Sequence, residues 1–268
     1  MALQQTSYRG CLLGMAVGDA MGYTVDHRSW SEIQEDYGPN GLLGYDLVNG
    51  YADVTSNTQL AAFTCNGLLF GLTRGQMTGK MAPFIKYIAL ASCEWAASQR
   101  AYNRPARNYC WLPRREEICR RHCMDTRMLE TLSRRNLGTL ETPNNNYNGP
   151  YGLTAAIGVG LFYDKDRMDQ WEIDRLGAEA VALTYGSPTA FLSGAVLAHI
   201  MSKLLRNPGT PLKKVVMEAV EAMKEQFGHQ YSQAAAIGTL IRHAITYSET
   251  YGVSAVEVME KLGCDNAA

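Results

Sequence analysis

The chain has 268 residues and a formal net charge of −1 at pH 7. This length is sufficient for one large domain with a sizeable core, and the near-zero charge gives no overall field that favours nucleic acid or an anionic membrane. No apolar run reaches the roughly 18 residues of a membrane-spanning helix, and the seven cysteines show no framework spacing. We therefore expect a soluble, cytoplasmic protein with no membrane or nucleic-acid partner.

Apolar residues recur at spacings of three and four in segments rich in Ala, Leu and Met, and alternating strand patterns are scarce. This composition predicts an all-α protein. Capping-box patterns at Ser29 with Glu32 and at Ser254 with Glu257 mark two helix starts. No low-complexity linker or repeat divides the chain, so we expect a single domain over residues 1–268. In chain order, helices are predicted over residues 6–22, 29–37, 58–72, 79–98, 153–163, 169–185, 188–205, 212–227, 232–251 and 254–262.

The first predicted helix carries a glycine stripe, in which Gly10, Gly14, Gly18 and Gly22 are spaced four residues apart. Residues at this spacing lie on nearly one face of a helix. The stripe would let another helix backbone approach closely, so tight packing is one interpretation and a functional face is the other. Asp19 is the only acidic residue of this helix.

Residues 100–135 differ in composition from the rest of the chain. This Arg-rich segment holds ten arginines against four acidic residues. It is either a solvated surface segment whose arginines form ion pairs within the chain, or an insertion that meets phosphates or an acidic partner.

Two motifs near the N-terminus carry a resemblance to a known family. The first is the glycine-rich stretch from Arg9 to Gly22, and the second is Thr55-Ser56-Asn57-Thr58, which an apolar run follows. Together they resemble the start of the ADP-ribosylglycohydrolase family, in which a glycine-rich first helix precedes a Thr-Asp-Asp-Thr motif that binds magnesium. The resemblance implies a compact all-α fold of about ten helices. It also implies hydrolysis of the bond that joins ADP-ribose to a protein side chain or a small acceptor.

The resemblance places a metal site at Thr55, Ser56 and Asn57, where Ser56 and Asn57 replace both aspartates of the family motif. Magnesium usually takes carboxylate ligands that offset its charge, so the loss of two negative charges predicts weak or no magnesium binding. The family also ends in a Gly-Asp-x-Asp-Thr motif that this chain lacks. The resemblance thus implies a C-terminally shortened chain, whose first helix has an exposed apolar surface that a second copy or another partner covers.

Two acidic residues remain near the expected cleft as candidate catalytic residues. Asp19 and Asp26 are each suited to general-base catalysis without a metal, and Asp19 has the alternative role of holding backbone N–H groups at a turn. The resemblance further implies a substrate-binding set from a glycine-rich loop and a later Thr-Tyr segment, in which a tyrosine replaces the family's histidine: Asn148, Gly149, Tyr151, Gly152, Thr184 and Tyr185.

These observations leave three functions open. The favoured one is a degenerate family member that binds ADP-ribose or a related nucleotide, free or on an ADP-ribosylated protein, with magnesium-dependent hydrolysis lost or much reduced. The second is an active hydrolase of an ADP-ribosyl N- or O-glycosidic bond that uses Asp19 or Asp26. The third is a non-enzymatic interaction module that docks an acidic partner on the Arg-rich segment.

Overall fold

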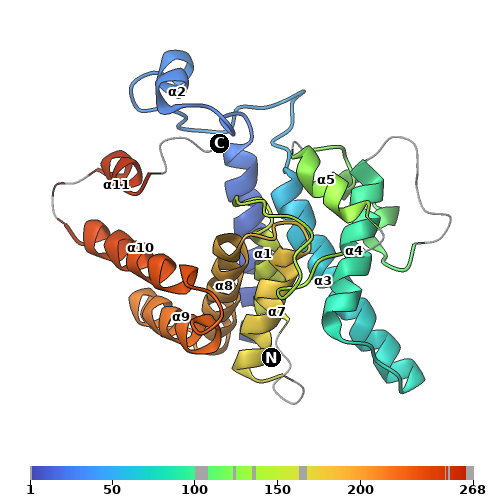
Figure 1. The fold of residues 1–268 in the computed structure, drawn as a ribbon. Helices are drawn as coiled ribbons and strands as arrows, with labels where there is room; N and C mark the ends of the chain where they lie inside the picture. The colour runs from blue at the N-terminus through green and yellow to red at the C-terminus, as the bar shows by residue number, and fades with distance from the viewer. Residues whose placement is uncertain are drawn as a thin grey trace.

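A computed structural model describes residues 2–99, 108–122, 125–134, 137–162, 168–250, 252 and 254–263 of the chain, with side chains from residue 5 onward. Parts of the Arg-rich segment and residues 264–268 therefore lie outside the described residues. Within the described ranges the protein forms eleven α-helices, two short 3-10 helices and no β-strand (Figure 1). The all-α prediction is confirmed.

Ten of the α-helices lie where the sequence pattern predicts them, and α5, inside the Arg-rich segment, was not predicted. Both capping boxes form, at Ser29 and at Ser254. The third helix extends to Thr78, beyond its predicted end at residue 72. Gly79, with φ of 65°, supplies the left-handed cap that ends it there. The α-helices are α1 (Ala2–Gly22), α2 (Trp30–Tyr37), α3 (Ser56–Thr78), α4 (Phe84–Gln99), α5 (Thr126–Leu132), α6 (Thr154–Leu161), α7 (Gln170–Ala182), α8 (Pro188–Arg206), α9 (Leu212–Phe227), α10 (Gln233–Ser248) and α11 (Ala255–Lys261).

The core is centred on α6, α7 and α8. Helices α3 and α4 pack on one side of this centre, and α9 and α10 pack on the other (Figure 1). Where α7 meets α8, a Cβ atom on Gly177 would lie 2.8 Å from the carbonyl oxygen of Gly194, and a Cβ atom on Gly194 would lie 2.8 Å from that of Gly177. Only glycine at both positions allows this approach, so the pair fixes how closely the two central helices pack.

Helix α8 is long and apolar enough to cross a membrane by length and composition, and it alone passes that test in the described part of the chain. Half of its apolar window is buried inside the molecule, where α8 packs against α6, α7 and α9. A position in the core is sufficient to account for its apolar character.

Helix α1 does not pack as the tight-packing interpretation of the glycine stripe requires. A Cβ atom built on any of the four glycines meets no described atom of another element within 4 Å. No described helix backbone therefore approaches the stripe, and that interpretation is wrong for the described part of the chain. From residue 5 onward Ala20 is the one buried residue of α1, while Leu13 and Val17 are 59% and 55% exposed. Helix α1 therefore rests on α3 and α8 and leaves an apolar face uncovered by the described residues.

Candidate functional site

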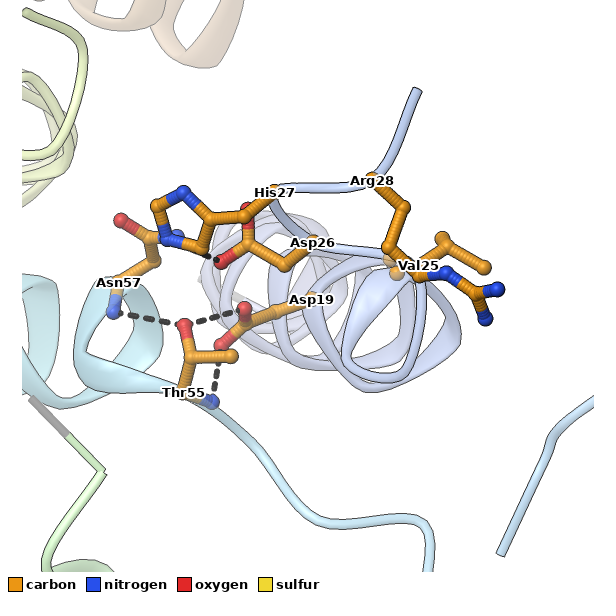
Figure 2. A pocket seen from close by; sticks show the side chains of 9 residues that line it. Asp19, Val25, Asp26, His27, Arg28, Thr55 and Asn57 are labelled. Atoms are coloured by element: carbon orange, nitrogen blue, oxygen red, sulfur yellow. Dashed lines mark hydrogen bonds and ion pairs between the residues drawn. The ribbon is translucent and has the colours of Figure 1, made fainter. Parts of the chain in front are cut away.

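Two adjoining cavities lie between the end of α1, the start of α3 and the loop before α6. Their shared wall consists of Gly18, Asp19, Asp26 and Asn57. The smaller, which we call the polar compartment, has a volume of about 280 Å³ and is also lined by Gly22, Val25, His27, Arg28 and Thr55 (Figure 2). The larger, the apolar compartment, has a volume of about 510 Å³ and is also lined by Gly14, Met15, Pro150, Tyr151, Leu153, Thr154, Ile157 and Leu197.

The glycine stripe of α1 faces these cavities. Gly14 and Gly18 line the apolar compartment, and Gly18 and Gly22 line the polar one. Since a Cβ atom at each position would meet open space, the missing side chains provide room for the cavities. The apolar compartment falls within the roughly 300–1,000 Å³ of typical small-molecule sites.

The carboxylate of Asp19 is fully engaged by the first turn of α3. Its Oδ1 atom accepts a hydrogen bond from the Thr55 hydroxyl at 2.6 Å, and Oδ2 accepts one from the Thr55 N–H at 2.8 Å (Figure 2). Oδ2 also accepts from the Thr58 hydroxyl at 2.6 Å and from the Thr58 N–H at 3.2 Å. A carboxylate has about four acceptor sites, so Asp19 is used as an anionic cap of α3, at the end where the helix dipole favours negative charge.

The three residues at the metal-motif position do not fit a magnesium centre. Thr55, Ser56 and Asn57 are uncharged, and the Thr55 hydroxyl already donates to Asp19 and accepts from the Asn57 N–H at 3.1 Å. No group of three or more His, Cys, Asp or Glu side chains that could hold a metal ion occurs among the described residues. Magnesium usually takes several oxygen ligands, carboxylates among them. Among the described residues that line the cavities, the carboxylates are Asp26 and Asp19, which already accepts hydrogen bonds from Thr55 and Thr58, and this set is insufficient.

Asp26 lies in a small cluster with His27 and Tyr151. His27 Nε2 is 3.6 Å from Asp26 Oδ2, and the Tyr151 hydroxyl is 3.0 Å from both ring nitrogens of His27. The His27 and Tyr151 rings stack with centroids 5.4 Å apart. Burial and the negative charges of Asp26 and Asp125 raise the pKa of Tyr151, so its hydroxyl stays protonated at neutral pH. The cluster thus brings a carboxylate, an imidazole and a phenol to the cavities.

His27 was missed by the sequence reasoning. Its backbone has φ of 64°, a left-handed conformation that is uncommon for residues other than glycine and is often found at functional sites. This conformation turns the imidazole towards Tyr151, and no pattern in the sequence marks it.

The predicted substrate-binding residues divide into two groups. Tyr151 lines the apolar compartment, whereas Asn148, Gly149 and Gly152 belong to the same loop without lining either cavity. Thr184 and Tyr185 are 2% and 0% exposed, and the structure does not bring them to the cavities. They pack beneath the loop, where a Cβ atom on Gly152 would lie 2.7 Å from Thr184 Oγ1.

Tyr185 instead takes part in a buried polar contact. Its hydroxyl donates to Asp125, which also caps α5 and forms an ion pair with Arg127 at 3.1 Å. Burial and the Asp125 contact raise the pKa of Tyr185. Burial alone would raise the pKa of Asp125, but hydrogen bonds from Arg127 and Tyr185 outweigh it and lower that pKa. Tyr185 therefore anchors α5 beneath the loop.

A second residue missed from the sequence, Asn145, holds the same loop. Its Oδ1 atom accepts hydrogen bonds of 2.9 Å from the Tyr147 N–H and from the Gly186 N–H. Its Nδ2 atom donates to the Thr184 carbonyl at 3.2 Å. The run of three asparagines at 144–146 indicated a loop, but which of them bridges to the α7–α8 turn is set by the tertiary structure.

Part of the Arg-rich segment lies close to the candidate site. Arg120 Nη1 lies 3.0 Å and His122 Nε2 3.2 Å from Asp53 Oδ2, and His122 Nδ1 lies 3.2 Å from the Tyr23 hydroxyl. The ion pairs of Arg120 and Arg127 support the interpretation of intrachain pairing for these two. Four arginines of the described part of the segment are exposed and have no ion pair with a described residue: Arg114, Arg115, Arg121 and Arg134.

The comparisons with known proteins agree with the architecture. A model of the ADP-ribosylglycohydrolase family matches residues 2–266 of the chain, and no curated protein matches it. The matched range includes α1, the start of α3 and the loop before α6, the three parts that form the cavities. Because this match covers nearly its whole length, the chain belongs to the ADP-ribosylglycohydrolase family.

Proposed function

We propose that this protein binds ADP-ribose or a related nucleotide in the two compartments, and that magnesium-dependent hydrolysis is lost or much reduced. The observation that carries the proposal is the state of Asp19, whose carboxylate accepts four hydrogen bonds from Thr55 and Thr58. In this arrangement the carboxylate oxygens of Asp19 on α1 are paired with hydrogen-bond donors at the start of α3. Family membership supports the ligand class.

The chemistry of the site supports binding over metal-assisted hydrolysis. The resemblance implies that magnesium positions the ribose and a water molecule in active members, and the residues at this position do not fit that ion. Asp26 and Asn57, on the wall that both compartments share, are suited to hydrogen-bond ribose hydroxyls. The stacked pair of Tyr151 and His27 offers aromatic surface to a base.

A second candidate function is metal-free hydrolysis, and one observation favours it. Asp26 faces both compartments, and His27 Nε2 lies 3.6 Å from its carboxylate. In this scheme Asp26 accepts a proton from a water molecule that attacks the anomeric carbon, and protonated His27 donates a proton to the departing acceptor. Asp19 is less suited to the role of base because its carboxylate already accepts four hydrogen bonds.

Calorimetry with ADP-ribose, together with release of ADP-ribose from modified arginine and serine, tests the proposal. We expect saturable binding whose Kd changes less than about threefold when magnesium is added, and no magnesium-dependent release. Magnesium-dependent release would overturn it. Metal-independent release that disappears in Asp26→Asn would instead establish the second candidate function.

A further inference from the structure

We infer that the nucleoside part of the ligand supplies the affinity of this site, and that the cavities select nucleosides without phosphate over their phosphorylated forms. The inference rests on the proposed function and narrows its ligand class. It follows from what the cavities offer to an anion and what they offer to a flat, uncharged ring.

Two helices, α3 and α6, begin at the cavities, and a helix N-terminus binds phosphate through its free N–H groups. At α3 the N–H groups of Thr55 and Thr58 are not available to a phosphate, because both donate hydrogen bonds to the Asp19 carboxylate. At α6 the N–H groups of Leu153, Ala155 and Ala156 donate to carbonyl oxygens of the preceding turn. These N–H groups at both helix starts therefore already have acceptors from their own chain.

The charged side chains around the cavities also disfavour phosphate. Asp19 and Asp26 are the charged residues among those that line the apolar compartment, so an anion there meets two carboxylates. Arg28 lines the polar compartment, but its guanidinium donates to the Asp36 carboxylate and to the Glu32 carbonyl oxygen. In Figure 2 the Arg28 side chain points away from Asp26 and Asn57. Its charge is thus already compensated by residues of α2, the helix that follows it.

The apolar compartment suits a base with an attached ribose. Its walls come from aliphatic side chains, the Tyr151 ring and the bare backbone of Gly14 and Gly18. Thr154 lines it as well, and its buried Oγ1 atom has no hydrogen-bond partner. A buried hydroxyl without a partner is costly, and a polar edge of a base or a ribose hydroxyl would satisfy it. A nucleoside combines the required flat apolar surface with such polar groups.

Calorimetry without magnesium on adenosine, AMP, ADP and ADP-ribose tests the order of affinities. We expect adenosine to bind more tightly than AMP and ADP, and ADP-ribose to bind no more tightly than adenosine. Higher salt should strengthen the binding of AMP and ADP, since it screens the repulsion between their phosphates and the carboxylates of Asp19 and Asp26. An affinity that rises about tenfold with each phosphate and weakens with salt would overturn the inference while leaving the proposed function standing. If none of the four compounds binds, the inference and the proposed function fail together.

A matched pair of variants on α1 locates the binding. Gly14→Leu fills the apolar compartment and Gly10→Leu adds the same side chain one turn away, outside both cavities. Neither Cβ atom meets a described atom within 4 Å, so both variants should fold. We expect Gly14→Leu to weaken adenosine binding more than about tenfold and Gly10→Leu to leave it unchanged. Equal binding by Gly14→Leu and the unmodified protein would overturn the assignment to this compartment.

Discussion

The Asp19 carboxylate and the Thr55 hydroxyl lie 2.6 Å apart, and their hydrogen bond joins the last turn of α1 to the first turn of α3. With three further hydrogen bonds from Thr55 and Thr58, the carboxylate of Asp19 is stabilised by N–H and O–H donors and by the positive end of the α3 dipole. These hydrogen bonds tie the end of α1 to the start of α3 at the wall of the cavities.

Substituting Asp19 by Asn should destabilise the whole protein. An amide retains one acceptor oxygen, and its NH₂ group would face donors of Thr55 or Thr58, so at least one donor is left unpaired. We expect the free energy of unfolding in urea to fall by about 1.5–3 kcal/mol, as for the loss of hydrogen bonds to a charged group. Asp26→Asn is the matched control, because no N–H group of a helix start in the described part of the chain donates to Asp26. A wild-type unfolding curve for Asp19→Asn would refute the capping role.

The two tyrosines near the loop should respond in opposite ways. Tyr151 lines the apolar compartment, so Tyr151→Ala should weaken ligand binding by about tenfold through loss of stacking area, with little effect on stability. Tyr185→Phe removes a buried hydrogen bond to Asp125, so it should lower stability by about 1–3 kcal/mol and leave the Kd for ligand unchanged. Calorimetry and urea unfolding on both variants separate the roles. A weaker Kd in Tyr185→Phe would return that residue to the binding set.

Local signals in the sequence were sufficient for most of the fold. The boxes at Ser29 and Ser254 are contacts between residues three apart, so the sequence alone predicts them. The glycine stripe shows the limit of such signals. Its periodicity identifies the helix and the shared face, but whether that face meets a helix or a cavity depends on how α1 sits on α3 and α8, which periodicity does not encode.

The resemblance named positions along the chain, and only some of them line the cavities. Asp26, Asn57 and Tyr151 do so, whereas Thr184 and Tyr185 do not. The capping role of Asp19 had been considered, yet its four bonds involve residues 36 and 39 positions away. The place of the His27 side chain at the cavities depends on the left-handed backbone conformation of this one residue. Contacts over such separations have no periodic signature in one sequence.

Glu94 illustrates the same limit and yields a prediction about the Arg-rich segment. This residue is 6% exposed, and its two carboxylate oxygens accept the N–H groups of Tyr109 at 2.7 Å and Cys110 at 3.0 Å. Asn66 Oδ1 accepts the next two N–H groups, those of Trp111 and Leu112, at 3.0 and 2.9 Å. Two buried side chains from α4 and α3 therefore hold four consecutive backbone groups of the segment.

Glu94→Gln should release this loop. The NH₂ group of the new side chain would face one of the two backbone donors, which costs about 1–3 kcal/mol for the unpaired group. We expect lower stability in urea and faster trypsin cleavage at Arg114 and Arg115, since the loop that precedes them opens more often. Glu225→Gln, on an exposed position of α9, should change neither property. Unchanged cleavage in Glu94→Gln would show that Asn66 alone is enough to hold the loop.

The pH dependence of stability should report on Asp53, which joins the Arg-rich segment to the start of α3. Burial alone would raise the pKa of Asp53, but hydrogen bonds from Arg120 and the Val54 N–H, with the charge of His122, outweigh it and lower the pKa below its ordinary 3.8. A carboxyl group with a lowered folded-state pKa stabilises the protein above its unfolded pKa and loses that contribution as the pH falls through the folded value. Asp53→Asn should therefore lower the free energy of unfolding by about 1–3 kcal/mol at pH 7, and the difference from the unmodified protein should shrink below about pH 4.

Unfolding in urea from pH 7 to pH 3 measures this difference, with Glu225→Gln as the control. A difference that stays constant over this range would mean that packing of the side chain, and not its charge, ties Arg120 and His122 to the site.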